Sequence, residues 1–313
     1  MIDPKLDAFL DLFVEIQKKC QTMTLPEARK YLDDFVISIP VPIVEVHQIQ
    51  DLKVDQIPVR MYVPEGKAPF GAIVYFHGGG WVFGSTKKSD SFCRALCKKT
   101  GFCVLSADYR LAPEAHFPKG LDDCYKVVRW VKEKAVSLGI DPTKIGVAGT
   151  SAGGNLAAAV ALMAKDTEEF DLAFELLFFP VLTSFMDKKA YEASLDQRFI
   201  TFEGMASFWS LYLARPEDGD HPYASPLKSE SFEKLPPTLI LVAEHDPLTA
   251  DGKAYDEALR KYGVKTVFKF YPGMFHDFIN MPLDLPSTQI ALSDMADFLE
   301  CTVSNSKPES PAN

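Results

Sequence analysis

The sequence predicts an α/β fold with a mostly parallel sheet of about eight strands and helices on both faces. Short apolar runs alternate with amphipathic stretches from about residue 70 onward, and this alternation is typical of a parallel sheet buried between helices. The chain has 313 residues, of which 47% are hydrophobic. A chain of this size and composition can bury one large core, so a single α/β domain is expected.

The elements follow a simple order along the chain. Asp3 and Pro4 have the pattern of a cap and first residue of an opening helix. Strand-like runs begin near residue 43, and the first two are expected to form an antiparallel edge. Strands are predicted at about 44–54, 57–65, 70–79, 102–110, 144–149, 174–182, 238–246 and 266–274. Helices are predicted at about 121–139, 155–165, 252–263 and 286–301.

Residues 183–222 interrupt this alternation with seven aromatic side chains, and Thr201 is a candidate cap for a helix within them. An insertion this long between buried strands must lie outside the sheet. Together with residues 1–50 it is expected to form a helical cap over a core of residues 51–182 and 223–303, while an ordinary surface excursion stays open. The polar residues 304–313 are expected to be a disordered tail.

Composition excludes several classes of function. The net charge is −10 without any basic cluster, so nucleic acid is not an expected partner. No apolar run reaches the length of a membrane span, and the acidic N-terminus does not resemble a signal peptide, which together predict a cytoplasmic protein. The six cysteines are scattered without metal-ligand spacing, so neither a metal nor a cofactor is expected. A homodimer stays open.

The stretch 149–153, GTSAG, has the G-x-S-x-G pattern of a nucleophile elbow. It follows a predicted strand and begins a predicted helix, which is the context that such an elbow requires. Gly149 and Gly153 would allow the chain to turn sharply, so that Ser151 presents its hydroxyl outward. Ser151 is therefore the candidate nucleophile, and its helix N-terminus offers unpaired N–H groups to an anion.

A serine nucleophile needs a histidine base and an acid that orients the base. Of six histidines, His276 follows the last predicted strand in a loop, from which it can reach back over the sheet edge. Asp246 directly follows the preceding strand and gives the chain order Ser, Asp, His. The alternative acids are Glu244, Asp251 and Asp277, and the alternative histidines are His47, His77, His116, His221 and His245.

With these residues in place, the chain resembles the hormone-sensitive-lipase-like carboxylesterases of the α/β-hydrolase fold. Seven motifs in order carry the resemblance: HGGGW at 77–81, DYRLAPE at 108–114, FPKGLDDC at 117–124, GTSAGGNLAA at 149–158, ASPL at 224–227, LPPTLILVAEHDPL at 235–248 and YPGMFHDF at 271–278. Thr150, where many members have Asp, places the chain in the smaller, GTSAGG branch. The family usually has a second Asp at position 250, here Ala250, and a glycine at position 277, here Asp277.

The resemblance implies which groups would bind the developing oxyanion. The Ala152 N–H would supply one donor and the glycine run the others, with Gly79 and Gly80 the expected pair. A side chain at either glycine would obstruct the substrate carbonyl, whereas His77 is expected to shape the loop. Aromatic residues are expected to contact the substrate: Trp81, Phe208, Trp209 and Tyr212.

The expected function is a serine carboxylesterase that hydrolyses short to medium acyl esters through an acyl-enzyme, with small-molecule esters as its partners. Activity is expected on nitrophenyl acetate through hexanoate. Two alternatives remain. The same triad is competent for amide, carbamate or lactone hydrolysis. A non-catalytic small-molecule receptor is also conceivable, although the presence of His276 argues against it.

Overall fold

The computed structural model describes residues 4–39, 41–192, 198–281 and 285–304. Within these residues one mixed, mostly parallel sheet contains eight strands in the order β1-β2-β4-β3-β5-β6-β7-β8. Their bounds are β1 Gln48–Val54, β2 Ile57–Val63, β3 Phe70–Phe76, β4 Cys103–Ala107, β5 Ile140–Thr150, β6 Glu175–Phe178, β7 Thr238–His245 and β8 Thr266–Phe275. The predicted fold class is confirmed, including the antiparallel edge, because β1 pairs with β2 and β2 with β4 in antiparallel register.

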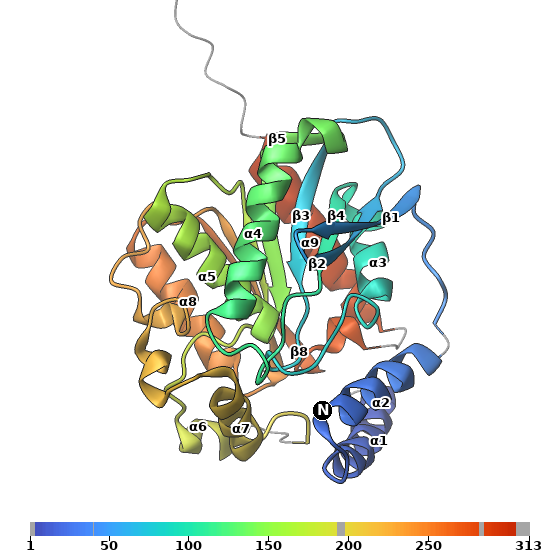
Figure 1. The fold of residues 1–313 in the computed structure, drawn as a ribbon, viewed down its shortest axis with the longest axis vertical. Coiled ribbons are helices and arrows are strands. Elements are labelled where there is room, and N and C mark those ends of the chain that lie inside the picture. Colours follow the sequence, from blue (N-terminus) through green and yellow to red (C-terminus); the bar gives the residue numbers. More distant parts are fainter. Residues whose placement is uncertain (1–3, 40, 193–197, 282–284, 305–313) are drawn as a thin grey trace, which may run out of the picture.

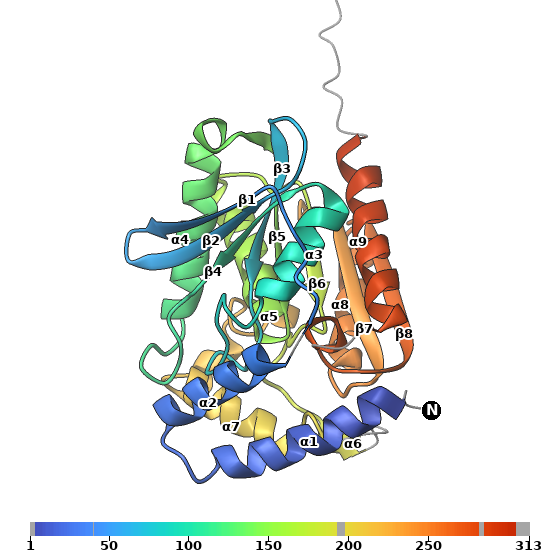
Figure 2. The same ribbon diagram turned by 90° about the vertical axis from the view of Figure 1, so that its right-hand side faces the viewer.

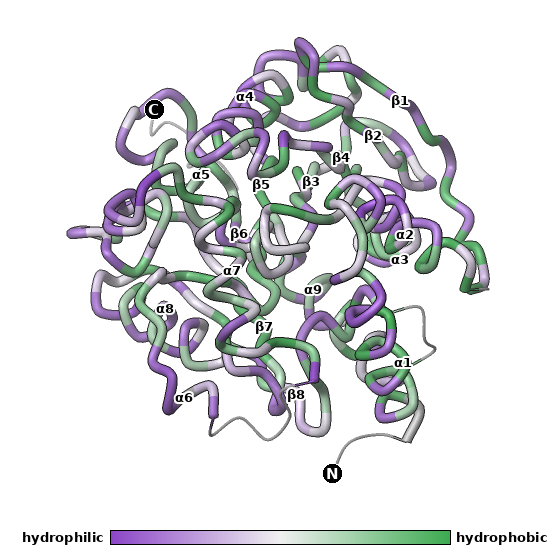
Figure 3. Tube along the Cα trace, turned by 60° about the horizontal axis from the view of Figure 1, so that its bottom comes forward, coloured by the Kyte–Doolittle hydropathy of each residue, from purple (hydrophilic) through white to green (hydrophobic). Residues whose placement is uncertain are grey.

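Helices cover both faces of the sheet (Figures 1 and 2). One core cluster joins the sheet to α4 and α5, with α8 beside them, and a second joins the other face to α1, α3 and α9. The helix bounds are α1 Pro4–Cys20, α2 Leu25–Ser38, α3 Asp90–Thr100, α4 Lys119–Lys134, α5 Ala152–Thr167, α6 Lys188–Glu192, α7 Phe202–Tyr212, α8 Thr249–Lys261 and α9 Pro286–Ser304. Several outer helices change between hydrophilic and hydrophobic colours along the trace, as expected of one apolar face each (Figure 3).

Both segments assigned to a cap lie at one end of the sheet. Helices α1 and α2 lie at the same end of the sheet as α6 and α7 in two perpendicular views (Figures 1 and 2). Thr201 caps α7 as predicted, since its Oγ1 accepts the Gly204 N–H at 2.9 Å. Residues 193–197 of the insertion, and the predicted tail beyond Ser304, lie outside the described residues.

Helix α2 was not predicted, although its N-terminus carries a recognisable signal. Thr24 precedes a leucine, a proline and Glu27, and the Thr24 N–H donates to the Glu27 carboxylate at 2.9 Å. In a capping box, the side chain of the third helical residue accepts the N–H of the cap residue, and this is the bond seen here. Proline in the first turn is a further signal of a helix start. In the described parts of the chain, no helix is long and apolar enough to cross a bilayer.

Glu175 is a fully buried acid at the first residue of β6. Its Oε2 accepts a hydrogen bond from Thr238 Oγ1 at 3.0 Å, while its Oε1 has no partner among the described residues. Burial raises the pKa of Glu175 to about 7, because an ionised carboxylate is poorly solvated in the core. The folded protein therefore holds this proton at pH values where the unfolded chain has released it.

Replacing this acid by its neutral isostere tests the consequence for stability. Since the folded-state pKa lies above the unfolded one, Glu175 contributes stability below about pH 4.5 that is lost as the pH rises to about 7, a loss of about 3 kcal/mol. The free energy of unfolding of Glu175→Gln, measured by denaturant titration between pH 5 and 8, should lack this decline. Wild-type and variant curves that stay parallel over this range would show that Glu175 does not titrate as described.

Candidate active site

Ser151 occupies the sharp turn between β5 and α5. Its backbone has φ 56° and ψ −117°, a strained conformation for a residue with a side chain. The Ser151 N–H donates to the Phe178 carbonyl at the end of β6 at 2.8 Å. A Cβ at Gly149 would lie 2.0 Å from the Gly153 oxygen, and one at Gly153 would lie 2.0 Å from the Phe76 oxygen. Both glycines are therefore required by close backbone contacts.

His276 follows β8, and Asp246 follows β7 at the same end of the sheet. His276 Nδ1 lies 2.8 Å from Asp246 Oδ2, and both side chains are buried. The other carboxylate oxygen, Oδ1, accepts the Leu248 N–H at 2.9 Å. The ring of Phe179 links this pair to the nucleophile turn, because it lies 5.7 Å from the His276 ring and directly follows Phe178.

The alternative acids have other partners. Asp251 accepts the Leu182 N–H at 2.9 Å, and Glu244 accepts the Gly273 N–H at 2.7 Å. Burial raises the pKa of Asp251 to about 7, and the nearby Asp246 adds to this rise. The second Asp that is usual in the family is absent at position 250. The carboxyl group of Asp251, one position later, holds the loop after β6.

Two of the alternative histidines have structural positions. His77 is buried, stacks on Tyr109 at 4.3 Å between centroids, and has its Nδ1 2.9 Å from the Gly78 carbonyl. Burial lowers the pKa of His77, which favours a neutral ring that donates from Nδ1. A Cβ at Gly84 would collide with this ring at 2.4 Å. His116 Nδ1 lies 2.9 Å from the Leu211 carbonyl and thus joins the core to α7.

The glycine run lies against the nucleophile turn. A Cβ at Gly78 would lie 3.0 Å from the Thr150 oxygen and 3.4 Å from the Ser151 Cβ. Among the described residues, no backbone group accepts a hydrogen bond from the Gly79 or Gly80 N–H.

Gly79 and Gly80, the second and third glycines of the run, are required by contacts within the protein itself. Gly79 has φ +120°, and a Cβ there would lie 2.4 Å from the Phe83 oxygen. Gly80 has φ +60°, and a Cβ there would lie 2.5 Å from the Phe208 ring. The loop itself and its contact with α7 therefore require these residues, before any substrate is bound.

Three of the four aromatic residues expected to contact the substrate are buried against one another in the structure. Trp81 stacks on Tyr212 with centroids 4.2 Å apart, and Trp209 lies 4.5 Å from Trp81. All three are at most 4% exposed, because Trp209 and Tyr212 of α7 pack against Trp81 of the glycine loop. Only Phe208 is partly exposed, and it lies over Gly80.

Sequence reasoning missed a different aromatic residue. Phe199 is half-buried, and its ring lies 5.7 Å from the His276 ring and 4.5 Å from the Phe13 ring of α1. The neighbouring Arg198 donates to Asp7 at 2.6 Å and to Asp11 at 2.7 Å, also on α1. The N-terminal helix and the insertion thus meet beside the candidate base. Phe13 and Phe199 are 186 positions apart in the sequence, so no local pattern could reveal this contact.

Arg29 of α2 was missed for the same reason. Its guanidinium donates to the carbonyls of Val82 and Ala112, each at 2.7 Å, and pairs with both oxygens of Glu114 at 2.7 and 2.8 Å. Val82 directly follows HGGGW, so α2 is fastened to the glycine loop. An arginine fork of this kind is stronger and more directional than a simple ion pair.

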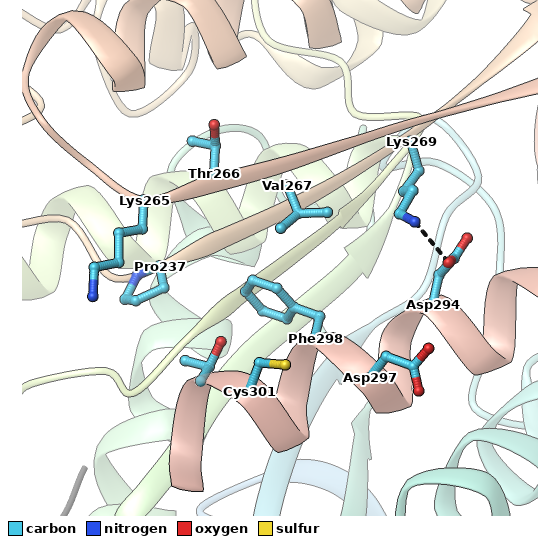
Figure 4. A pocket seen from close by; sticks show the side chains of 10 residues that line it. Pro237, Lys265, Thr266, Val267, Lys269, Asp294, Asp297, Phe298 and Cys301 are labelled. Carbon is cyan, nitrogen blue, oxygen red and sulfur yellow. Dashed lines mark ion pairs between the residues drawn. The ribbon is translucent and has the colours of Figure 1, made fainter. Parts of the chain in front are cut away.

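A cavity of about 410 Å³ lies elsewhere, between β8 and α9 (Figure 4). Phe298 and Val267 lie at its centre, and Lys269 pairs with Asp294 at 2.8 Å on its rim. None of Ser151, Asp246 or His276 lines it, so it is separate from the candidate active site.

Known proteins resemble this chain over nearly its whole length. The family model of the alpha/beta hydrolase fold matches residues 73–280. Carboxylesterase NlhH of Mycobacterium tuberculosis is 34% identical over 291 residues, 91% of each chain. An arylesterase of Saccharolobus solfataricus is 31% identical, over 90% of this chain and 93% of its own.

Solved structures agree with these relatives. The esterase of Pyrobaculum calidifontis superimposes with a TM-score of 0.86 at 34% identity, covering 97% of this chain and 99% of its own. An ester hydrolase from the metagenome of Lake Arreo gives a TM-score of 0.90 at 31% identity, covering 97% and 100%. The chain belongs to the hormone-sensitive-lipase-like esterase family of the alpha/beta hydrolase fold.

Proposed function

We propose that this protein is a serine carboxylesterase that hydrolyses short to medium acyl esters through Ser151, His276 and Asp246. That the chain is a carboxylic ester hydrolase follows from its relatives, among them a carboxylesterase, an arylesterase and an ethyl acetate hydrolase of Pseudomonas putida. The observation that carries the residue assignment is the buried His276–Asp246 pair, at the same end of the sheet as the strained Ser151.

The reaction proceeds in two half-reactions. His276 accepts the hydroxyl proton as Ser151 Oγ attacks the ester carbonyl carbon, and Asp246 stabilises the resulting imidazolium. When the tetrahedral intermediate collapses, the ester C–O bond breaks and the imidazolium protonates the departing alcohol. Water then attacks the acyl-enzyme with His276 again as base, and the carboxylic acid and free Ser151 are released.

The oxyanion is stabilised by N–H groups that are already in place. Ala152 begins α5, where N–H groups lack intrahelical acceptors, and the Gly79 and Gly80 N–H groups complete the set. Preorganised donors of this kind contribute about 3 kcal/mol each to transition-state stabilisation. Arg29 supports the glycine loop through the Val82 carbonyl, which limits its movement during the reaction.

The walls of the site favour apolar groups of modest length. Phe199 lies beside His276, and Phe208 lies over Gly80. We infer that α1, α2, α6 and α7 act as a cap that confines the acyl and alcohol groups. Hydrolysis of amides, carbamates or lactones requires the same nucleophile and base, so it stays the second candidate activity. The buried His276–Asp246 pair gives no support to a receptor without turnover.

Replacing the nucleophile separates an enzyme from a receptor. Ser151→Ala should lose at least about 10⁴-fold in kcat, because the acyl-enzyme can no longer form. Labelling by a fluorophosphonate probe, detected by mass spectrometry, should disappear with it. Ser137→Ala changes an exposed serine in the turn after α4 and should label like the wild type. Labelling that persists in Ser151→Ala, or never occurs in the wild type, would refute the assignment.

A chain-length series measures the depth of the acyl site. Nitrophenyl esters from acetate to hexanoate should be the best substrates in kcat/KM, and longer chains should fall off because the cap limits the apolar space. A maximum near sixteen carbons would contradict the proposed substrate range and leave the triad intact.

Phe199 is expected to limit acyl or alcohol length. Phe199→Ala opens apolar space beside His276, so the ratio of kcat/KM for hexanoate over acetate should rise by about fivefold or more. Phe185→Ala removes a ring from the same segment that is 78% exposed and should leave the ratio unchanged. The same ratio in both variants and the wild type would remove Phe199 from the substrate site.

A further inference from the structure

Asp277 has an unusual conformation directly after the proposed base. Its backbone is left-handed, with φ 65° and ψ 19°, a region where residues other than glycine are uncommon. The residue is only 8% exposed. A buried acid in a backbone conformation that favours glycine incurs both a conformational and a desolvation cost. Its side chain must therefore make interactions that offset these costs.

The side chain of Asp277 is the end of a hydrogen-bonded chain that reaches the nucleophile turn. Asn280, in the short 3₁₀ helix Phe278–Asn280, donates its Nδ2 to Asp277 Oδ1 at 2.6 Å. The same nitrogen donates to Thr150 Oγ1 at 3.2 Å, and Thr150 Oγ1 lies 2.9 Å from the Tyr75 hydroxyl of β3. Thr150 directly precedes Ser151. Side chains thus connect the residue after the base to the residue before the nucleophile.

Asp277, Thr150 and Tyr75 of this chain are buried, and the surroundings of Asp277 supply charge. Gly78, Lys88, Ser89, Asp277 and Asn280 line a small hollow of about 10 Å³ behind the glycine loop. Burial raises the pKa of Asp277, while Lys88 and His276 oppose the rise and Asp246 adds to it. Tyr75 is the other titratable group that interacts with this carboxyl, and its pKa is raised, first by its own burial.

We propose that Asp277 is a positioning residue that fixes the place of His276 relative to Ser151 through its hydrogen-bond chain to Asn280 and Thr150. Its negative charge also favours the imidazolium form of His276. This inference rests on the proposed function. The triad residues come from three separate strand ends, and the pair His276–Asp246 fixes the base only toward β7. The Asp277 chain supplies the corresponding restraint toward β5. Misplacement of a catalytic group by about 1 Å costs up to about 10²-fold in rate, so such a restraint is expected to act on kcat.

Two substitutions separate the charge from the hydrogen-bond chain. Asp277→Asn keeps an acceptor for Asn280 and tolerates the left-handed backbone, but it removes the charge. The acidic limb of the kcat/KM pH profile should move to lower pH, since removing a negative charge near the base disfavours the protonated base. Asp277→Gly removes the chain and relieves the backbone strain. It should lower kcat by about tenfold, with KM within about twofold, while thermal stability is kept or increased.

A double-mutant cycle tests whether Asp277 acts through Thr150. Thr150→Val removes the hydroxyl at nearly constant volume, and the double variant Thr150→Val/Asp277→Gly should be about as slow as the slower single variant. Glu175→Gln is the matched control, because it makes a carboxyl-to-amide change in a buried acid at the start of β6, away from the end that contacts Ser151. Its kcat/KM pH profile should match that of the wild type.

The outcomes are distinct from those that test the triad. An unshifted acidic limb in Asp277→Asn, or kcat losses of Thr150→Val and Asp277→Gly that multiply independently, would overturn this proposal while Ser151 remained essential. Activity retained in Ser151→Ala would instead refute the proposed function, whatever residue 277 does.

Discussion

The strained turn at Ser151 is the constraint on which the site depends. A positive φ at a residue with a side chain costs about 1–3 kcal/mol, and this turn is held by backbone contacts on every side. Gly153 approaches β3, Gly149 approaches Gly153, and the Ser151 N–H bonds to the end of β6. Helix α5 behind it is buried along most of its length, so the core around it stabilises the geometry that the turn alone would not adopt. The serine is thus positioned by the sheet and not by flexible loops.

Helices α1 and α2 contact the candidate site, whose other residues lie far along the chain. Arg29 of α2 holds the glycine loop by its backbone carbonyl, and Phe13 of α1 packs on Phe199 beside His276. Asp7 and Asp11 hold Arg198 by exposed ion pairs, which are individually weak and sensitive to salt. The aromatic contact of Phe13 with Phe199 does not involve charge, so it is expected to hold these two segments together at high salt as well.

The strands could be predicted, and Ser151 proposed as the nucleophile, because their signals are local. Strands alternate with helices, and the motif around Ser151 needs only five residues and their flanking elements. The roles of the α7 aromatics could not be predicted, because residues 208, 209 and 212 all lie on one short helix and only the packing decides which face meets the core. Trp209 and Tyr212 are three positions apart and face inward, whereas Phe208 turns toward Gly80. Phe199 and Arg29 act through contacts distant in sequence, which no motif records.

Three carboxyl groups gather near the ends of β7 and β8, and their partners separate their roles. Asp246 places one oxygen on His276 Nδ1 and the other on the Leu248 N–H, so both oxygens have a hydrogen-bond partner. Asp251 faces backbone N–H groups, and its pKa is raised to about 7 by burial and by Asp246. The pKa of Asp277 is also raised by burial, with Lys88 acting against it. Like charges in one low-dielectric region disfavour one another, so the hydrogen-bond partners of each acid matter for its role. The bond to His276 Nδ1 therefore distinguishes Asp246, while Asp251 and Asp277 hold the loops that carry its partners.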